Sequence, residues 1–288
     1  MTQTAAPAPG TFAHANTYTI PAAARPLAAL LPARRGRAWT VEHPRSVFRP
    51  GAPTAALTDG VRTLYLVENA GRLEVFTAEF DPLPEPPALI VDGTEPDPIA
   101  EVAAGVLRSV LPLVDNEIAA NIARTHGWMG ALTARMDHLR EFGYALAAHG
   151  ITPEPGSVAA TAPGLIWTAG GGGTWGLSMR GLQSNLRLNY YGPLSGLYGL
   201  LPHLLPPHQG PALPDASSVT TRGLIERFPQ LRPAAEAGAA WLPGHPLPGG
   251  HIVSLADKGT PVDDATRVAA EFDGIGVDLL IAAAAHLI

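Results

Sequence analysis

The sequence has no cysteine, and Lys258 is the only lysine among its 288 residues. The absence of cysteine excludes disulfides, thiolate metal sites, iron–sulfur ligation and a cysteine nucleophile. A single lysine leaves little room for Schiff-base or P-loop chemistry. These shortages do not limit folding, because 46% of the residues are apolar and can supply a large core.

An excess of positive charge is also missing. The formal net charge is −6, which gives no support to binding of nucleic acid or of an anionic membrane. The apolar run 276–288 is too short to span a bilayer, and residues 1–16 lack the basic start and apolar run of a secretory signal. We therefore expect a cytoplasmic protein without nucleic-acid or membrane partners, with residues 1–16 disordered and 276–288 forming a buried helix.

Helix and strand patterns occur in the same order twice, which predicts an α+β fold built from two helix–three-strand–helix units with antiparallel sheets. The first unit has a helix at 22–31, strands at 38–43, 61–68 and 73–80, a short strand at 88–91 and a helix at 99–110. The second has a helix at 131–149, strands at 164–169, 174–180 and 185–190, and a helical segment at 194–205.

Local signals support several of these boundaries. Asn69-Ala70-Gly71 is typical of a three-residue hairpin connection. Asp97 and Pro98 suit the cap and first position of a helix that Pro112 closes or kinks. A further helix is expected at 115–125, followed by a break at Gly127 and Gly130. The expected regions are a disordered 1–16, units at 17–114 and 115–206, and a mixed, mainly helical extension at 207–288.

The extension differs from the two units in composition and pattern. It begins with a proline-rich linker and carries helical patterns at 219–228 and 232–240. A strand is expected at 251–255. Thr260, followed by Asp263 and Asp264, predicts a helix that starts at Pro261.

The glycine run 170–173 is a candidate phosphate loop. Phosphate binding needs a strand-to-helix connection, so that a helix N-terminus supplies aligned N–H groups. Here the run lies between two expected strands and fits neither GK[ST] nor GxGxxG. We interpret it as a hairpin tip.

One face of the second unit's strands is polar. Alternation along 174–180 and 185–190 places Ser178, Arg180, Arg187 and Asn189 on that face. Two arginines on a shallow sheet face suit carboxylate ligands, although a solvated sheet face has the same pattern.

Histidines offer an alternative, acid–base or metal-binding, site. His245, His251 and Asp257 flank a proline–glycine loop and would converge if that loop folds back. His126, Asp137 and His138 are close in sequence but lie on either side of the expected helix break. No HExxH or GxSxG motif is present. Ten histidines in this length make such clusters common by chance, so no metal or cofactor is expected.

Without a coherent catalytic set, the sequence favours a non-enzymatic, chaperone-like adaptor that binds a protein or peptide partner on a sheet face or in a groove between units. In layout alone, the paired units resemble secretion chaperones, which is a likeness of element order and not of function. The alternatives are an enzyme that uses His245, His251 and Asp257, or a structural subunit of a larger complex. Self-association into a homo-oligomer is compatible with each.

Overall fold

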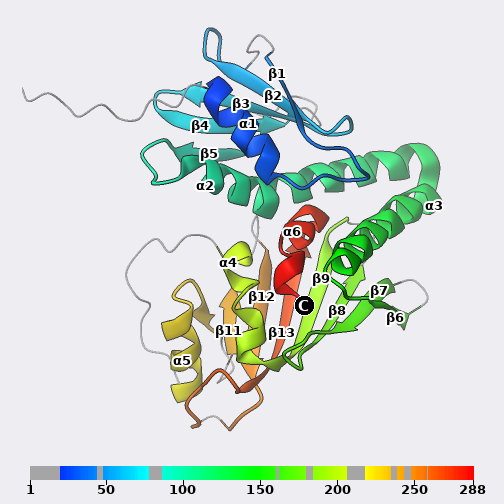
Figure 1. Ribbon diagram of the computed structural model, residues 1–288, viewed down its shortest axis with the longest axis vertical. Coiled ribbons are helices and arrows are strands. Elements are labelled where there is room, and N and C mark those ends of the chain that lie inside the picture. Colours follow the sequence, from blue (N-terminus) through cyan, green and yellow to red (C-terminus); the bar gives the residue numbers. More distant parts are fainter. Residues whose placement is uncertain are drawn as a thin grey trace, which may run out of the picture.

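The computed structural model describes residues 20–43, 48–77, 86–159, 162–179, 184–205, 218–234, 239–242, 248–257 and 259–288. The expected disorder at 1–16 falls outside these residues. Two antiparallel sheets lie above and below a long bent helix (Figure 1). The α+β class and the antiparallel pairing are therefore confirmed.

The smaller sheet is a five-stranded meander in the order β1-β2-β3-β4-β5. Helices α1 (Ile20–Leu30) and α2 (Pro98–Gly105) pack on one face, where Leu57, Leu64 and Val75 are buried. On the other face Phe48 stacks on Phe76, which covers that side of the sheet. The strands are β1 (Thr40–Glu42), β2 (Thr54–Thr58), β3 (Thr63–Asn69), β4 (Arg72–Thr77) and β5 (Leu89–Asp92).

The hairpin between β3 and β4 is confirmed, but its loop is one residue shorter than expected. Asn69 pairs with Arg72, so only Ala70 and Gly71 form the connection. Both have positive φ, 50° and 79°, as in the type I′ turns that match strand twist.

The helix that follows runs almost without interruption from Pro98 to Ala148. Asp97 caps it by accepting a hydrogen bond of 3.0 Å from the Ala100 N–H, which confirms the predicted start. Helix α2 continues through one π turn, Val106–Val110, into α3 (Leu111–Ala148). Of the two outcomes expected at Pro112, the end of the helix is therefore wrong, because the wide turn just before Pro112 accommodates a residue without an N–H.

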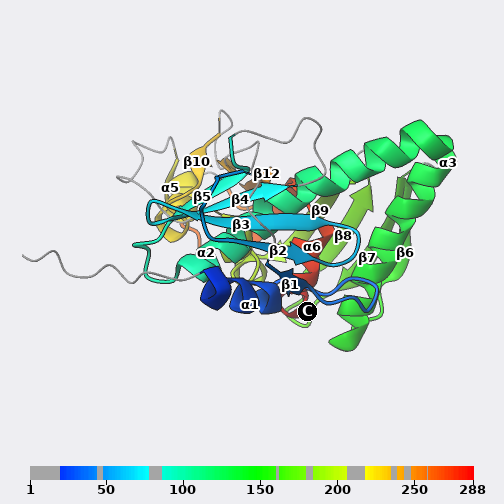
Figure 2. The same cartoon turned by 90° about the horizontal axis from the view of Figure 1, so that it is seen from above.

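Helix α3 bends sharply at Gly127, whose φ of 69° and ψ of −176° are accessible essentially to glycine alone. The bend divides α3 into a first arm, residues 111–126, and a second arm, residues 128–148. The arms diverge from the bend and enclose one end of the five-stranded sheet (Figure 2). The second arm ends before Gly150, with φ 85°, as the sequence predicts.

The larger sheet has eight strands in the order β10-β11-β12-β13-β9-β8-β7-β6. Its outer strands are β6 (Glu154–Ala159), β7 (Ala162–Thr168), β10 (Arg232–Pro233), β11 (Ala239–Leu242) and β12 (Gly249–Ser254). Its central strands are β8 (Thr174–Met179), β9 (Leu186–Pro193) and β13 (Arg267–Ile275). The glycine run forms the turn between β7 and β8, which confirms the hairpin tip.

The mainly helical extension and the helix from Pro261 are wrong, because β10 to β13 complete the larger sheet through the β13–β9 pair. Val268, Ala270 and Phe272 alternate into the core along β13, a period of two that specifies a strand. The expected helix at 232–240 is likewise replaced by β10 and β11. The predicted duplication of a three-strand unit is also wrong, since the sheets have five and eight strands.

Short helices and the second arm of α3 cover one face of the larger sheet (Figure 1). Leu177, Leu188 and Phe272 point into this core. The helices are η2 (Leu194–Leu197), α4 (Leu201–Leu204), α6 (Val277–Ala282) and η3 (Ala284–His286), while α5 (Val219–Arg227) packs beside β10 and β11. Among the described helices, none is both long and apolar enough to cross a membrane.

Candidate functional site

A tight turn at Arg34–Arg37 is the first segment of the chain that contributes to the candidate site. Arg34 and Arg37 exchange backbone hydrogen bonds of 3.1 and 2.9 Å, and the two residues between them, Arg35 and Gly36, have φ of 53° and 71°. Positive φ is uncommon for a residue with a side chain. The turn sends Arg34 into the interior and leaves Arg35 and Arg37 at the surface.

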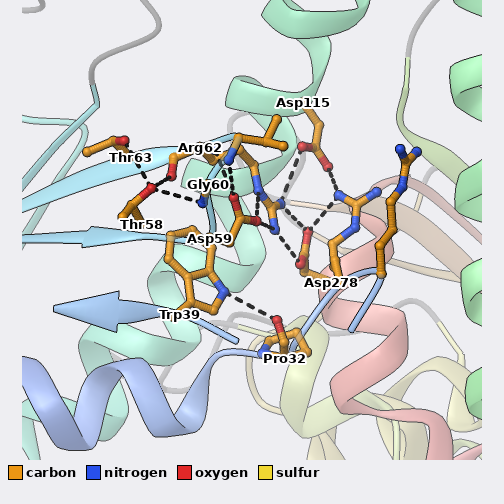
Figure 3. A network of polar contacts seen from close by, with 12 residues as sticks. Pro32, Trp39, Thr58, Asp59, Gly60, Arg62, Thr63, Asp115 and Asp278 are labelled. Atoms are coloured by element: carbon orange, nitrogen blue, oxygen red, sulfur yellow. Dashed lines mark hydrogen bonds and ion pairs between the residues drawn. The ribbon is translucent and has the colours of Figure 1, made fainter. Parts of the chain in front are cut away.

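A buried ionic network lies below this turn, where the two sheets meet the long helix (Figure 3). Arg62, immediately before β3, bonds to Asp59 at 2.7 Å, to Asp278 of α6 at 2.6 Å and to Asp115 of α3 at 3.3 Å. Arg34 bonds to Asp115 at 3.0 Å. The side chains of Arg62 and Asp278 are only 2% and 1% exposed.

The network is held in place from several directions. Asp59 accepts hydrogen bonds from the backbone N–H groups of Val61 and Arg62. The guanidinium of Arg62 also lies 5.1 Å from the Trp39 ring centre, and the Trp39 indole donates to the Pro32 carbonyl at 3.2 Å (Figure 3). The network therefore connects the smaller sheet to α6, which packs on the larger one.

Acidic side chains outnumber basic ones in the buried part of this network. Arg34 and Arg62 face four carboxylates, with Glu141 added to the three above through its bond of 2.7 Å to Arg34. Burial, with the neighbouring Asp278 charge, raises the pKa of Asp115 to about 6. Burial alone would raise the pKa of Asp59, but the Arg62 charge and hydrogen bonds hold that pKa below its usual value.

His138 lies on the second arm beside the network. Burial and then the nearby Arg34 charge lower its pKa to about 4, so its imidazole is neutral at pH 7. Its Nδ1 is buried and has no hydrogen-bond partner among the described residues.

A cavity of about 600 Å³ fills the angle between the two arms of α3. The Arg34–Arg37 turn, the β2–β3 turn with Val61, and the buried network form its base. Ile118 and Ile122 of the first arm supply an apolar wall. The second arm contributes Gly130, Thr133, Ala134, Asp137 and His138.

A second hollow of about 580 Å³ adjoins the first and shares Arg35 and Asp137 with it. It continues along the second arm past Arg140 and Glu141 to Tyr144 and Ala145. Arg35 bonds to Asp137 at 3.0 Å and to Glu141 at 2.9 Å, so this ion pair stands between the hollows. We call the two hollows together the α3 groove.

Large exposed apolar side chains gather on α3 near this groove. Trp128 and Met129 lie at the bend, and Met136 and Tyr144 follow along the second arm. Aromatic residues and methionine are enriched at protein interfaces. Val61 adds a further exposed apolar side chain at the base of the groove.

Three of the four residues predicted for the polar sheet face are described, on the neighbouring strands β8 and β9. Ser178 is buried and lies opposite Arg187. Arg187 bonds to Asp273 at 2.5 and 2.9 Å and to Glu271 at 3.0 Å, so two carboxylates already occupy it. Arg180 lies outside the described residues.

The alternative histidine site is only partly described, because His245 lies outside the described residues. His251 lies on β12 opposite Glu271, whereas Asp257 follows the far end of that strand. In the part of the chain that the structure describes, no group of three or more His, Asp or Glu side chains could hold a metal.

The structure instead places His251 near Asn189. A row across the larger sheet pairs Ile166 with Gly176, Gly176 with Asn189, Asn189 with Glu271, and Glu271 with His251. These five residues line a third, shallow hollow of about 410 Å³ on the sheet face.

The sequence does not predict the α3 groove, although three of its residues belong to a histidine and aspartate cluster noted in the sequence. His126, Asp137 and His138 come together across the bend at Gly127 and all line the first hollow. The missed residues include Arg34 and Arg62, whose partner Asp278 lies more than 200 residues away. The run Arg34-Arg35-Gly36-Arg37 was the available signal, since it combines charge with a turn glycine.

No family model, no curated protein and no solved structure matches this chain.

Proposed function

We propose that this protein is a non-enzymatic adaptor that binds a polypeptide segment of a partner in the α3 groove. The observation that carries the proposal is the adjacency of the two hollows, which share Arg35 and Asp137. Together they follow the second arm from Gly130 to Ala145, a length of roughly 22 Å at 1.5 Å per helical residue.

A groove of this length suits a chain better than a compact small molecule. Small-molecule pockets enclose most of the surface of one ligand. Here a ridge, the Arg35–Asp137 ion pair, separates two hollows of similar size. A helix or an extended segment that lies along the arm can contact both, as in helix-in-groove recognition.

The charges at the base of the groove support a binding role over a catalytic one. The carboxylates of Asp59, Asp115 and Glu141 each accept bonds from arginine. Such pairing stabilises the junction between the sheets and occupies the oxygens that a general base would use. The exposed Trp, Met and Tyr side chains on α3 offer contact area of the kind found at interfaces.

The test compares two alanine-to-tryptophan variants of the full chain. Ala134→Trp places an indole in the first hollow, and Ala269→Trp adds the same bulk to the sheet-face hollow. A random library of 16-residue peptides is selected on the unmodified protein, and binding of the enriched peptides is measured by fluorescence anisotropy. We expect Ala134→Trp to weaken binding at least tenfold and Ala269→Trp to leave it unchanged. Failure to enrich any peptide, or loss of binding only in Ala269→Trp, would overturn the proposal.

A further inference from the structure

The exposed charge around the α3 groove differs in sign from that of the whole chain. The chain has a net charge of −6, yet three arginines, Arg35, Arg37 and Arg140, stand at the surface of the groove. Arg35 and Arg140 side chains are 48% and 60% exposed, against 26% for Asp137, the most exposed carboxylate there.

These arginines keep N–H groups for a ligand. The Arg37 side chain has no partner among the described residues. Arg140 uses Nη1 on Asp137 at 2.6 Å, and Arg35 uses Nε and Nη2 on Glu141 and Asp137. An arginine has five N–H donors, so each of the three can still donate hydrogen bonds to a carboxylate.

The carboxylates of the groove are less available to a cation than its arginines are to an anion. Asp59, Asp115 and Glu141 are largely buried and bonded to Arg34 or Arg62. A basic partner would have to displace a buried arginine, and leaving a buried charge unpaired is costly. A carboxylate-bearing partner meets exposed guanidinium groups at once.

Exposed apolar side chains accompany the arginines along the second arm, where Tyr144 lines the second hollow and Met129 and Met136 lie outside the lining of both hollows. Met129, Met136 and Tyr144 are exposed at intervals of seven and eight residues, which place them on one stripe of the helix. Arg140 lies between Met136 and Tyr144 on the same stripe, four residues from each.

From this arrangement we infer that the α3 groove recognises an acidic, amphipathic polypeptide segment, with carboxylates on Arg35, Arg37 and Arg140 and apolar side chains on the methionine and tyrosine stripe. The inference rests on the proposed function, since it names the chemistry of the partner that the groove holds. Charge-assisted bonds between arginine and carboxylate supply both strength and orientation. The turn at Arg34–Arg37 places Arg35 at positive φ, and its ion pairs with Asp137 and Glu141 hold the side chain along the second arm before the partner binds.

The test uses the peptides selected from the random 16-residue library. Only those whose binding is weakened at least tenfold by Ala134→Trp are kept. We expect these groove-dependent peptides to be enriched in Asp and Glu alternating with apolar residues. Groove-dependent peptides that are neutral or basic would overturn the inference and leave the proposed function standing. A lack of any groove-dependent peptide would overturn both.

Charge-reversal variants then locate the recognition. Arg37→Glu and Arg140→Glu should each weaken the binding of an acidic peptide about tenfold or more. Arg222→Glu changes the net charge equally on the exposed face of α5, and binding to it should be unchanged. Equal weakening by all three variants would indicate non-specific attraction and contradict the inference. Far-ultraviolet circular dichroism of each variant confirms that the fold is retained.

Discussion

Substitution of Arg62 by methionine should destabilise the protein far more than loss of one of its acidic partners. Two buried arginines, Arg34 and Arg62, face Asp59, Asp115, Glu141 and Asp278. Arg62→Met leaves one arginine against four carboxylates. Asp278→Asn leaves two against three, which improves the balance while keeping the shape and some hydrogen-bonding capacity of the side chain.

The expected magnitude follows from the burial of these groups. Removing one partner of a buried ion pair typically costs about 3–5 kcal/mol, because the remaining charge stays buried and uncompensated. Arg62 bonds to three carboxylates and is 2% exposed, so we place Arg62→Met at the upper end, about 4–5 kcal/mol. Asp278→Asn should cost about 1–3 kcal/mol. Since whole domains are stable by only about 5–15 kcal/mol, the difference is large enough to measure.

Urea unfolding monitored by tryptophan fluorescence is a suitable assay, because Trp39 lies against the Arg62 guanidinium. Arg124→Met is the control. Its partner Glu117 is bonded at 3.0 Å at the exposed surface of α3, where a pair contributes about 0–1 kcal/mol. An Asp278→Asn cost equal to or greater than that of Arg62→Met would refute the charge accounting, as would an Arg62→Met cost no larger than the control.

Three further predictions concern the pH response and the long helix. The pKa of Asp115 is raised to about 6, so between about pH 4 and 6 its carboxyl binds more protons in the folded state than in the unfolded state, and its contribution to stability rises as pH falls. The pKa of His138 is lowered to about 4, so its contribution to stability falls as pH falls over the same interval. Asp115→Asn should therefore steepen the loss of stability on acidification, measured as urea midpoints from pH 7 to 4, and an unchanged slope would contradict this. Gly127→Ala should cost about 1–3 kcal/mol in urea unfolding because of its backbone angles. Gly143→Ala, where an added Cβ would lie 3.9 Å from Leu165 and Pro153 in ordinary contact, should stabilise by about 0.5–1 kcal/mol; equal effects would argue against the bend. Asp97→Ala should lose about 1 kcal/mol of cap energy by the same measurement, and a neutral result would show that the cap is dispensable.

Features set by neighbouring residues were predictable from the sequence. Asp97 and Pro98 specified the start of the long helix, and Gly127 specified its bend, because each acts through backbone chemistry within a few residues. The β3–β4 hairpin followed from Ala70-Gly71 in the same way.

Features that depend on distant pairing were not predictable. Pro112 normally ends a helix, but the buried stripe of Val106, Val110 and Val114 carries the helix through it by means of a π turn. Near β13 the sequence predicts a helix, because Thr260 resembles a cap and Asp263 and Asp264 suit a first helical turn. The strand β13 pairs with β12 on one side and, on the other, with β9, which lies about 80 residues earlier in the chain.

The candidate site illustrates the same limit. Its residues come from the turn after α1, the β2–β3 turn, both arms of α3 and α6, and no spacing rule links Arg34 to Asp278. The sequence supplied the charged and turn-forming residues but not their convergence, which depends on the bend at Gly127 and on the packing of α6.

The absence of cysteine allows a direct test of whether a partner lies in the α3 groove, because one introduced cysteine is the only thiol. Thr133→Cys places it on the exposed lining of the groove, and Thr174→Cys places it on the exposed lining of the sheet-face hollow. Alkylation rates are measured with and without a saturating peptide selected on the unmodified protein. We predict that the peptide slows alkylation of Thr133→Cys at least tenfold and leaves Thr174→Cys unaffected. Protection of Thr174→Cys alone, or of neither variant, would contradict a polypeptide-binding groove along α3.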